Sequence, residues 1–488
     1  MLSPDTDTAD RSRLLVLLRA HGSFELTESL FVRLLGLIYL SAFGSLWPQI
    51  VGLVGARGIA PAAHLLPAMR ASFGNRAFIY APSLFWLFPT DTALALFCAV
   101  GCLASVLMVL RFFSRSATVV CFVLYLSLSS IGQPFTSFQW DSLLLEAGFL
   151  AIFAGAPWLV WAYRLLVFRL MFESGWVKLA SHDPNWRNFH ALRFHFVTQP
   201  LPNPIAYYVF HAPAAILDAF TVLTLVIELF APFLLFGPRI AGYVGVAMLM
   251  LLQTAILLTG NYAFFNLLSL ALCLWGLDDK ALASFARLLH WRYPASARRI
   301  RPETVRMVGN LVLAVLIALA SIQLLESLSP GPSPIYRALG LVQPFEIVNS
   351  YGLFAVMTTS RPEIILEGSN DQLDWREYQF PYKPGNTHRS LPWVAPYQPR
   401  LDWQMWFAAL GDYQSSTWVG GLMYRLLTGE PSVYRLISPP PFDHPPHYMR
   451  ALLYDYGFTT SAERARTGAI WNRQLRGTWF GPVSLNGR

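Results

Sequence analysis

Charged residues are scarce in this chain: Asp, Glu, Lys and Arg make up 13% of its 488 residues, against roughly 25% in typical soluble proteins. Cysteine is scarcer still. The four cysteines lie inside apolar runs, where a thiol usually serves as a small packing group. None follows Cys273, so the C-terminal part of the chain is expected to hold no disulfide.

Several functional motifs are also missing. We find no P-loop, no G-x-S-x-G, no H-E-x-x-H and no Rossmann glycine set, which argues against an ATPase, a serine hydrolase or a zinc protease. The net charge of +8 does not indicate nucleic-acid binding, because the basic residues cluster in short loops between apolar runs. We therefore expect no nucleic acid, nucleotide, cofactor or metal.

Apolar residues are abundant instead: hydrophobic residues make up 55% of the chain and aromatic residues 15%. A soluble protein could not bury so much apolar surface, so the bilayer is the expected solvent. We predict a polytopic α-helical membrane protein of about nine spans with a C-terminal β-rich extramembrane domain. The expected spans are residues 34–56 (interrupted near Pro48), 92–110, 116–131, 143–163, 165–180, 214–236, two helices within 240–277 joined at Gly260-Asn261, and 304–326.

Lys and Arg gather in alternate loops, which predicts that residues 1–29 are cytoplasmic. These residues are polar and of mixed charge, and the apolar run after them is long enough to span, so we expect no cleavable signal peptide. Residues 30–328 form the bundle, and a Pro-rich linker covers 329–344. An odd number of spans places residues 345–488 in an ER lumen or a periplasm. The membrane would be that of the ER in a eukaryote, or the inner membrane in a bacterium.

The extramembrane part shows two short strands, 363–369 and 375–382, around a turn, and a third at 448–458. Trp403, Trp406, Phe407 and Leu410 have helical spacing, which predicts an amphipathic helix. The two tryptophans are most simply the core face of that helix. Docking at the membrane interface or a groove for a client protein is the alternative.

Ionisable residues within the spans are costly, and Glu146, Glu173, Lys178 and Glu228 are the ones that matter. They either form ion pairs between helices or leave Lys178 as an uncharged base in a dry site; a close carboxylate would keep it protonated. The outer loops 133–141 and 182–204 could cover a pocket above Lys178. The pocket candidates are Gln139, Trp140, Asp141, Glu146, Trp186, Arg187, His195, Gln199 and Glu228.

Long strings in this chain resemble the lipase maturation factor family. They include Gln-Pro-Phe-Thr-Ser-Phe-Gln-Trp-Asp at 133–141, Thr-Gln-Pro-Leu-Pro-Asn-Pro at 198–204, and Pro-Arg-Leu-Asp-Trp-Gln-Met-Trp-Phe at 399–407. The resemblance runs from about residue 30 to about residue 460. The animal members are ER membrane proteins with a lumenal C-terminal domain, and they help secreted homodimeric lipases reach their active fold.

The resemblance implies a chaperone-like maturation factor rather than an enzyme, with secreted clients, by resemblance lipases, and membrane lipids as partners. The client-contact candidates are Arg361, Trp375, Arg400, Trp403 and Trp406. This chain is shorter than the animal members and lacks their C-terminal extension and an evident ER-retrieval tail; bacterial members share its compact size.

A fainter resemblance concerns residues 171–179, Met-Phe-Glu-Ser-Gly-Trp-Val-Lys-Leu, with Asp183 and Trp186 after them. This segment is similar to one in DoxX-like proteins and in the vitamin K-dependent gamma-carboxylase, where the matching lysine is a base. It implies an alternative: a membrane enzyme that acts on a lipid, a quinone or a client side chain, with Lys178 and Glu173 as its catalytic residues.

Overall fold

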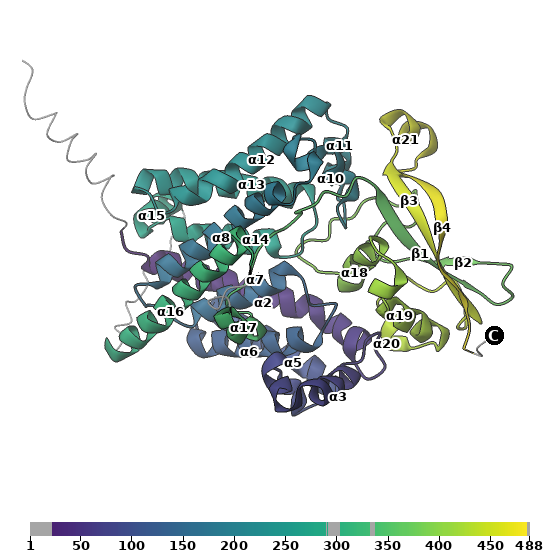
Figure 1. The fold of residues 1–488 in the computed structure, drawn as a ribbon, viewed down its shortest axis with the longest axis horizontal. Helices are drawn as coiled ribbons and strands as arrows, with labels where there is room; N and C mark the ends of the chain where they lie inside the picture. The colour runs from purple at the N-terminus through teal and green to yellow at the C-terminus, as the bar shows by residue number, and fades with distance from the viewer. Residues whose placement is uncertain (1–21, 289, 291–302, 332–336, 486–488) are drawn as a thin grey trace, which may run out of the picture.

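The computed structural model describes residues 22–288, 290, 303–331 and 337–485. The expectations for residues 1–21 and for residues 332–336 of the Pro-rich linker lie outside these ranges. In the described part, a bundle of helices is joined to a four-stranded sheet with its own short helices (Figure 1). The predicted fold class, a polytopic helical membrane protein with a C-terminal β-rich domain, is confirmed.

Six described helices are long and apolar enough to cross a membrane. They are α2 (Glu25–Val54), α5 (Asp91–Leu110), α6 (Ser114–Ile131), α12 (Ala214–Leu234), α13 (Arg239–Thr259) and α16 (Glu303–Leu328). Three more occupy the remaining expected positions: α7 (Gln139–Ala151), α8 (Leu159–Ala180) and α14 (Phe265–Cys273). Of these, α7 and α14 are short, while α8 carries four charged side chains.

Two details of the predicted spans are wrong. The expected span 143–163 is split, because α7 ends at Ala151 and α8 begins at Leu159; Gly155, with a φ of 88°, and Pro157 lie in between. The expected interruption near Pro48 is absent, since α2 continues through it to Val54. The turn at Gly260-Asn261 is confirmed between α13 and α14.

The two ends of the bundle contact different segments of the chain. At one end, the backbone N–H of Leu26 at the start of α2 donates to Asp279 over 2.9 Å. At the other end, Gly52 in the last turns of α2 packs against Ser432 of the sheet-bearing part. The start of α2 and the sheet thus lie at opposite ends of the bundle, as the ribbon shows (Figure 1).

Short helices complete the structure, most of them at the sheet end. They are α3 (Ala62–Phe73), α4 (Ala77–Tyr80), α9 (Pro184–Arg187), α10 (Leu192–Thr198), α11 (Pro204–Phe210), α15 (Asp279–Leu288), α17 (Leu339–Val342), α18 (Arg400–Ala409), α19 (Trp418–Leu427), α20 (Pro431–Tyr434) and α21 (Ser461–Thr467). The predicted helix at Trp403 is confirmed as α18, but its apolar stripe is divided: Trp403 is buried and Phe407 is exposed.

The sheet is antiparallel, with the strand order β2-β1-β3-β4. Its strands are β1 (Arg361–Ser369), β2 (Arg376–Tyr378), β3 (Tyr448–Phe458) and β4 (Trp471–Val483). Two predicted strands match β1 and β3, the predicted 375–382 shortens to β2, and β4 was not predicted. Strand β1 is buried along its whole length between the other strands and α18, so it ties the sheet to the rest of the molecule.

Candidate functional site at the junction of the bundle and the sheet

Arg400, the first residue of α18, reaches into the bundle and forms a buried ion pair with Asp141 of α7. Its two terminal nitrogens each lie 2.9 Å from an Asp141 oxygen. The same guanidinium donates to the Phe135 carbonyl over 2.7 Å and to the Tyr125 hydroxyl over 3.0 Å. Both side chains of the pair are fully buried, and such a bidentate pair has strict geometry. Arg400 therefore sets the position of α18 on the bundle.

A second buried cluster binds the chain segment that enters the sheet domain. Arg169 lies 2.7 Å from Glu146 and 3.8 Å from Glu173, all three in the bundle. Glu146 accepts from the Asn349 N–H over 3.0 Å and from the Tyr351 hydroxyl over 2.8 Å. Glu173 accepts from the Tyr351 N–H over 2.7 Å. The two carboxylates thus satisfy backbone groups of a segment that has no regular structure.

Lys178 is paired with Glu228, a partner that sequence reasoning did not assign to it. Its ammonium lies 2.8 and 2.9 Å from the two Glu228 oxygens and 3.0 Å from the Ser174 carbonyl, and the Trp186 ring centroid is 5.2 Å away. Glu173, which the enzymatic alternative grouped with Lys178, and Glu146 both lie beside Arg169 instead.

This geometry opposes the enzymatic alternative. A carboxylate at 2.8 Å favours the charged form of a lysine. The three N–H donors already have acceptors, so no lone pair is free to take a proton from a substrate. The pair serves to join α8 to α12, the interhelical role that the sequence left open.

The loops 133–141 and 182–204 meet around residues 349–357 of this chain, in the place where the sequence predicted a pocket. Gln139 accepts from the Gly352 N–H over 3.3 Å, and the Trp186 indole donates to the Phe354 carbonyl over 2.9 Å. The rings of Trp140 and Trp403 are 4.8 Å apart. Arg187 lies on the surface. The pocket roles of these residues remain a prediction.

His195 joins this region through Tyr262, whose hydroxyl lies 3.1 Å from the His195 Nε2 and donates to Gln199 over 3.0 Å. Burial, aided by the positive charge of Lys178, lowers the pKa of His195 to about 4. An unfolded histidine titrates near 6.5, so the unfolded state takes up the proton first as the pH falls. Stability is therefore lost between about pH 6.5 and pH 4.

We expect His195→Gln to flatten this acid limb, because glutamine offers a polar partner to Tyr262 but takes up no proton. The wild-type chain should lose about 1.4 kcal/mol per pH unit from this proton alone. Thermal unfolding of both purified chains between pH 4 and pH 7 measures it. Parallel curves for the two chains would contradict the assignment.

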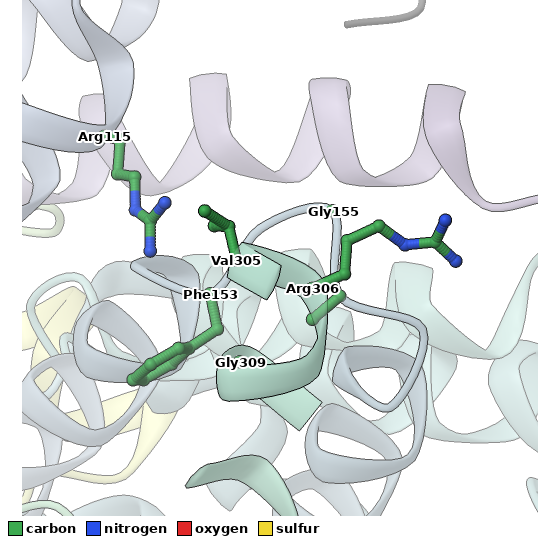
Figure 2. A pocket seen from close by; sticks show the side chains of 7 residues that line it. Arg115, Phe153, Gly155, Val305, Arg306 and Gly309 are labelled. Atoms are coloured by element: carbon green, nitrogen blue, oxygen red, sulfur yellow. The ribbon is translucent and has the colours of Figure 1, made fainter. Parts of the chain in front are cut away.

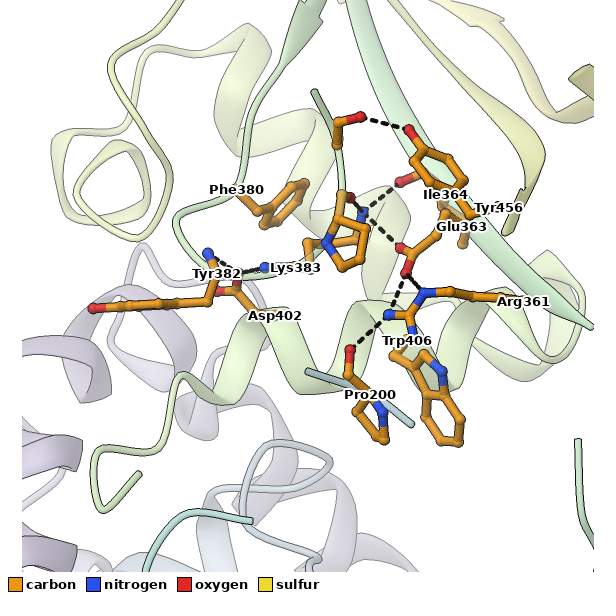
Figure 3. A network of polar contacts seen from close by, with 12 residues as sticks. Pro200, Arg361, Glu363, Ile364, Phe380, Tyr382, Lys383, Asp402, Trp406 and Tyr456 are labelled. Atoms are coloured by element: carbon orange, nitrogen blue, oxygen red, sulfur yellow. Dashed lines mark hydrogen bonds and ion pairs between the residues drawn. The ribbon is translucent and has the colours of Figure 1, made fainter. Parts of the chain in front are cut away.

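A third cluster clamps β1 to the loop after α10 (Figure 3). Arg361 and Lys383 lie 2.8 and 2.9 Å from opposite oxygens of Glu363, all three buried. Arg361 also donates to the carbonyls of Val197 over 2.8 Å and Pro200 over 2.7 Å. One arginine thereby holds both the sheet and the loop.

Asp402 of α18 caps the same region, since it accepts the backbone N–H groups of Tyr382 and Lys383, each over 2.8 Å. Burial raises the pKa of this carboxyl to about 6, although both hydrogen bonds oppose the shift. Next to it, the Trp406 indole donates to the Thr198 carbonyl over 2.9 Å.

These contacts bear on the residues predicted to touch a client. Arg361, Arg400, Trp403 and Trp406 are buried and bind other parts of this chain, so a client could reach them only if the junction opened. Trp375 is partly exposed, with the Arg450 guanidinium 4.1 Å above its ring. It remains a candidate for client contact.

Sequence reasoning missed seven residues whose side chains or backbone complete the buried clusters of the junction. They are Tyr125, Gln323, Asn349, Tyr351, Glu363, Lys383 and Asp402. One pattern could have found Glu363, because a carboxylate beside Ile364 and Ile365 in a strand is buried only when it is paired. The others carry no pattern that singles them out.

Comparison with known proteins gives two family matches and a set of curated relatives. Residues 26–284 match the lipase maturation factor transmembrane domain, and residues 347–481 match the lipase maturation factor C-terminal domain. Lipase maturation factor 2 of Gallus gallus is 35% identical over 93% of this chain and 81% of its own length. Lipase maturation factor 1 of Bos taurus is 33% identical over 95% of this chain and 90% of its own length. No solved structure matches significantly.

Proposed function

This chain belongs to the lipase maturation factor family, and from that premise we propose that it is a membrane-embedded factor that helps secreted lipases reach their active fold. One observation carries the proposal: both parts that define the family are present and are joined by the buried charges of the junction. A sheet domain held in place at the membrane can bind a partly folded client while that client exposes apolar surface.

The surface that we propose for clients is the outer edge of β4. In the described sheet β4 pairs with β3 on one side and with no strand on the other. An open edge can pair with an extended segment of another chain through backbone hydrogen bonds. Leu475 on this strand is 55% exposed and offers an apolar contact beside the edge.

We also propose that the sheet domain faces the ER lumen or the periplasm. Support comes from the excess of Lys and Arg in the loops at the opposite end of the bundle, where α2 begins. Reporter fusions after Leu258, Leu277 and Ser329 should report outside, inside and outside. Any other order would contradict this orientation.

A rescue experiment tests the function. In cells that lack their own maturation factor, we expect this chain to raise the activity of a secreted dimeric lipase relative to its secreted mass. We expect Leu475→Arg to lower this specific activity by half or more, because a charge replaces an apolar contact at the edge. The measurement is lipase activity and antigen in the medium.

The matched control is Leu373→Arg, which makes the same change at a leucine that is 85% exposed and lies in the turn between β1 and β2. Equal loss in both variants would argue against β4 as the client surface. If the unmodified chain, present at normal abundance, leaves lipase activity unchanged, the lipase proposal itself is wrong.

A further inference from the structure

A small hollow lies at the end of the bundle away from the sheet, where three long helices begin. It is bounded by the first turns of α6 and α16 and by residues 152–158, which lead into α8. Its lining is formed by Arg115, Phe153, Gly155, Ala156, Val305, Arg306 and Gly309. The side chains of Arg115 and Arg306 lie on either side of Val305 (Figure 2). Nothing in the proposed function uses this place.

The two arginines differ from two other arginines of the bundle. Arg169 and Arg239 are each paired with a carboxylate, at 2.7 and 2.6 Å. Arg115 and Arg306 are exposed, and neither has a hydrogen bond or ion pair with any residue of the described structure. One carboxylate contacts the lining of the hollow: Glu28 accepts the Gly155 N–H over 2.6 Å.

The surroundings place the hollow at the level of lipid headgroups. Phe113, two residues before Arg115, is 78% exposed, and Trp158, three residues after Gly155, is 47% exposed. Exposed aromatic side chains gather at the membrane interface. Along α16, Val308 and Leu311 expose apolar side chains toward lipid, where acyl chains can lie.

We propose that this hollow binds the phosphate of an anionic phospholipid. Guanidinium groups bind phosphate through paired, charge-assisted hydrogen bonds, and basic pockets between helices favour anionic headgroups. The backbone N–H groups at the starts of α6, α8 and α16 add partial positive charge. The acyl chains follow the exposed apolar side chains of α16.

The test uses the purified full-length chain and native mass spectrometry, with phosphatidylglycerol and phosphatidylcholine as probes. We expect phosphatidylglycerol to remain bound where phosphatidylcholine does not. Arg115→Gln combined with Arg306→Gln should weaken retention at least tenfold, since each basic side chain near the headgroups contributes about fivefold. Arg57→Gln with Arg76→Gln, the same charge change at exposed arginines near the sheet end, should have no effect.

Val305→Trp provides a second variant, which fills the hollow while it keeps both arginines. Weaker retention here, with unchanged thermal unfolding, supports the site even if the double variant folds poorly. Equal retention of the two lipids, or full retention in Val305→Trp, overturns the proposal. If the wild type retains no phosphatidylglycerol in the presence of millimolar inorganic phosphate, the site takes free phosphate, and the lipid assignment is wrong.

Discussion

Arg400→Met is expected to destabilise the whole protein by about 3–5 kcal/mol, because it leaves the Asp141 carboxylate buried without its cation. The Tyr125 hydroxyl and the Phe135 carbonyl lose a donor at the same time. Since folded proteins are stable by only about 5–15 kcal/mol, this single change should remove much of the folded population. Thermal unfolding of the purified chain and its yield in the membrane measure the effect.

A double-mutant cycle separates the lost pair from the lost side chain. Asp141→Asn with Arg400→Met removes both charges, and we expect it to be more stable than Arg400→Met alone. The control is Arg376→Met, which breaks an exposed pair with Asp374 at 3.1 Å and should cost less than about 1 kcal/mol. If Arg400→Met and Arg376→Met unfold alike, the junction does not depend on the buried charge.

Most of the fold could be predicted because each helix or turn follows from the residues of its own segment. The uncharged runs of α5 and α6 give helices at the expected places, and the Gly260-Asn261 turn separates α13 from α14. The errors have local causes as well. Residues 152–158 are as apolar as the spans on either side, so the sequence predicted one continuous helix here. Gly155 and Pro157 instead separate α7 from α8. Strand β4 combines Arg473, Gly477 and Pro482, which conceals its pattern.

The junction could be predicted only in part, because a partner is a property of the fold. Sequence reasoning selected Asp141, Glu146 and Arg400 as notable, but the partner of Arg400 lies 259 residues away along the chain. It interpreted Trp403 most simply as the core face of its helix, which the burial of Trp403 confirms. It also named Trp403 and Arg361 as candidates for client contact, since aromatic and arginine side chains are enriched at interfaces. The same side chains are suited to filling a buried, polar junction, and burial decides between the two uses.

Variants of the Lys178–Glu228 pair can distinguish a structural role of Lys178 from a catalytic one. We expect Lys178→Met alone to lower the amount of folded protein sharply, by about 3–5 kcal/mol of stability, because the Glu228 carboxylate is then left unpaired inside the bundle. Lys178→Met with Glu228→Gln leaves no buried charge at this place. The double variant should therefore regain much of the stability, which thermal unfolding measures.

Lipase rescue by the same variants decides what the lysine does. If the pair only joins α8 to α12, the double variant should restore lipase activity about as well as the wild type at matched abundance. A base could not be replaced by methionine, so an enzyme of the carboxylase type would stay inactive when folded. Lys280→Met, at an exposed lysine at the start of α15, is the control for loss of charge. A double variant that folds but does not restore lipase activity would support a catalytic role for Lys178, although all three of its N–H donors are hydrogen-bonded in this structure.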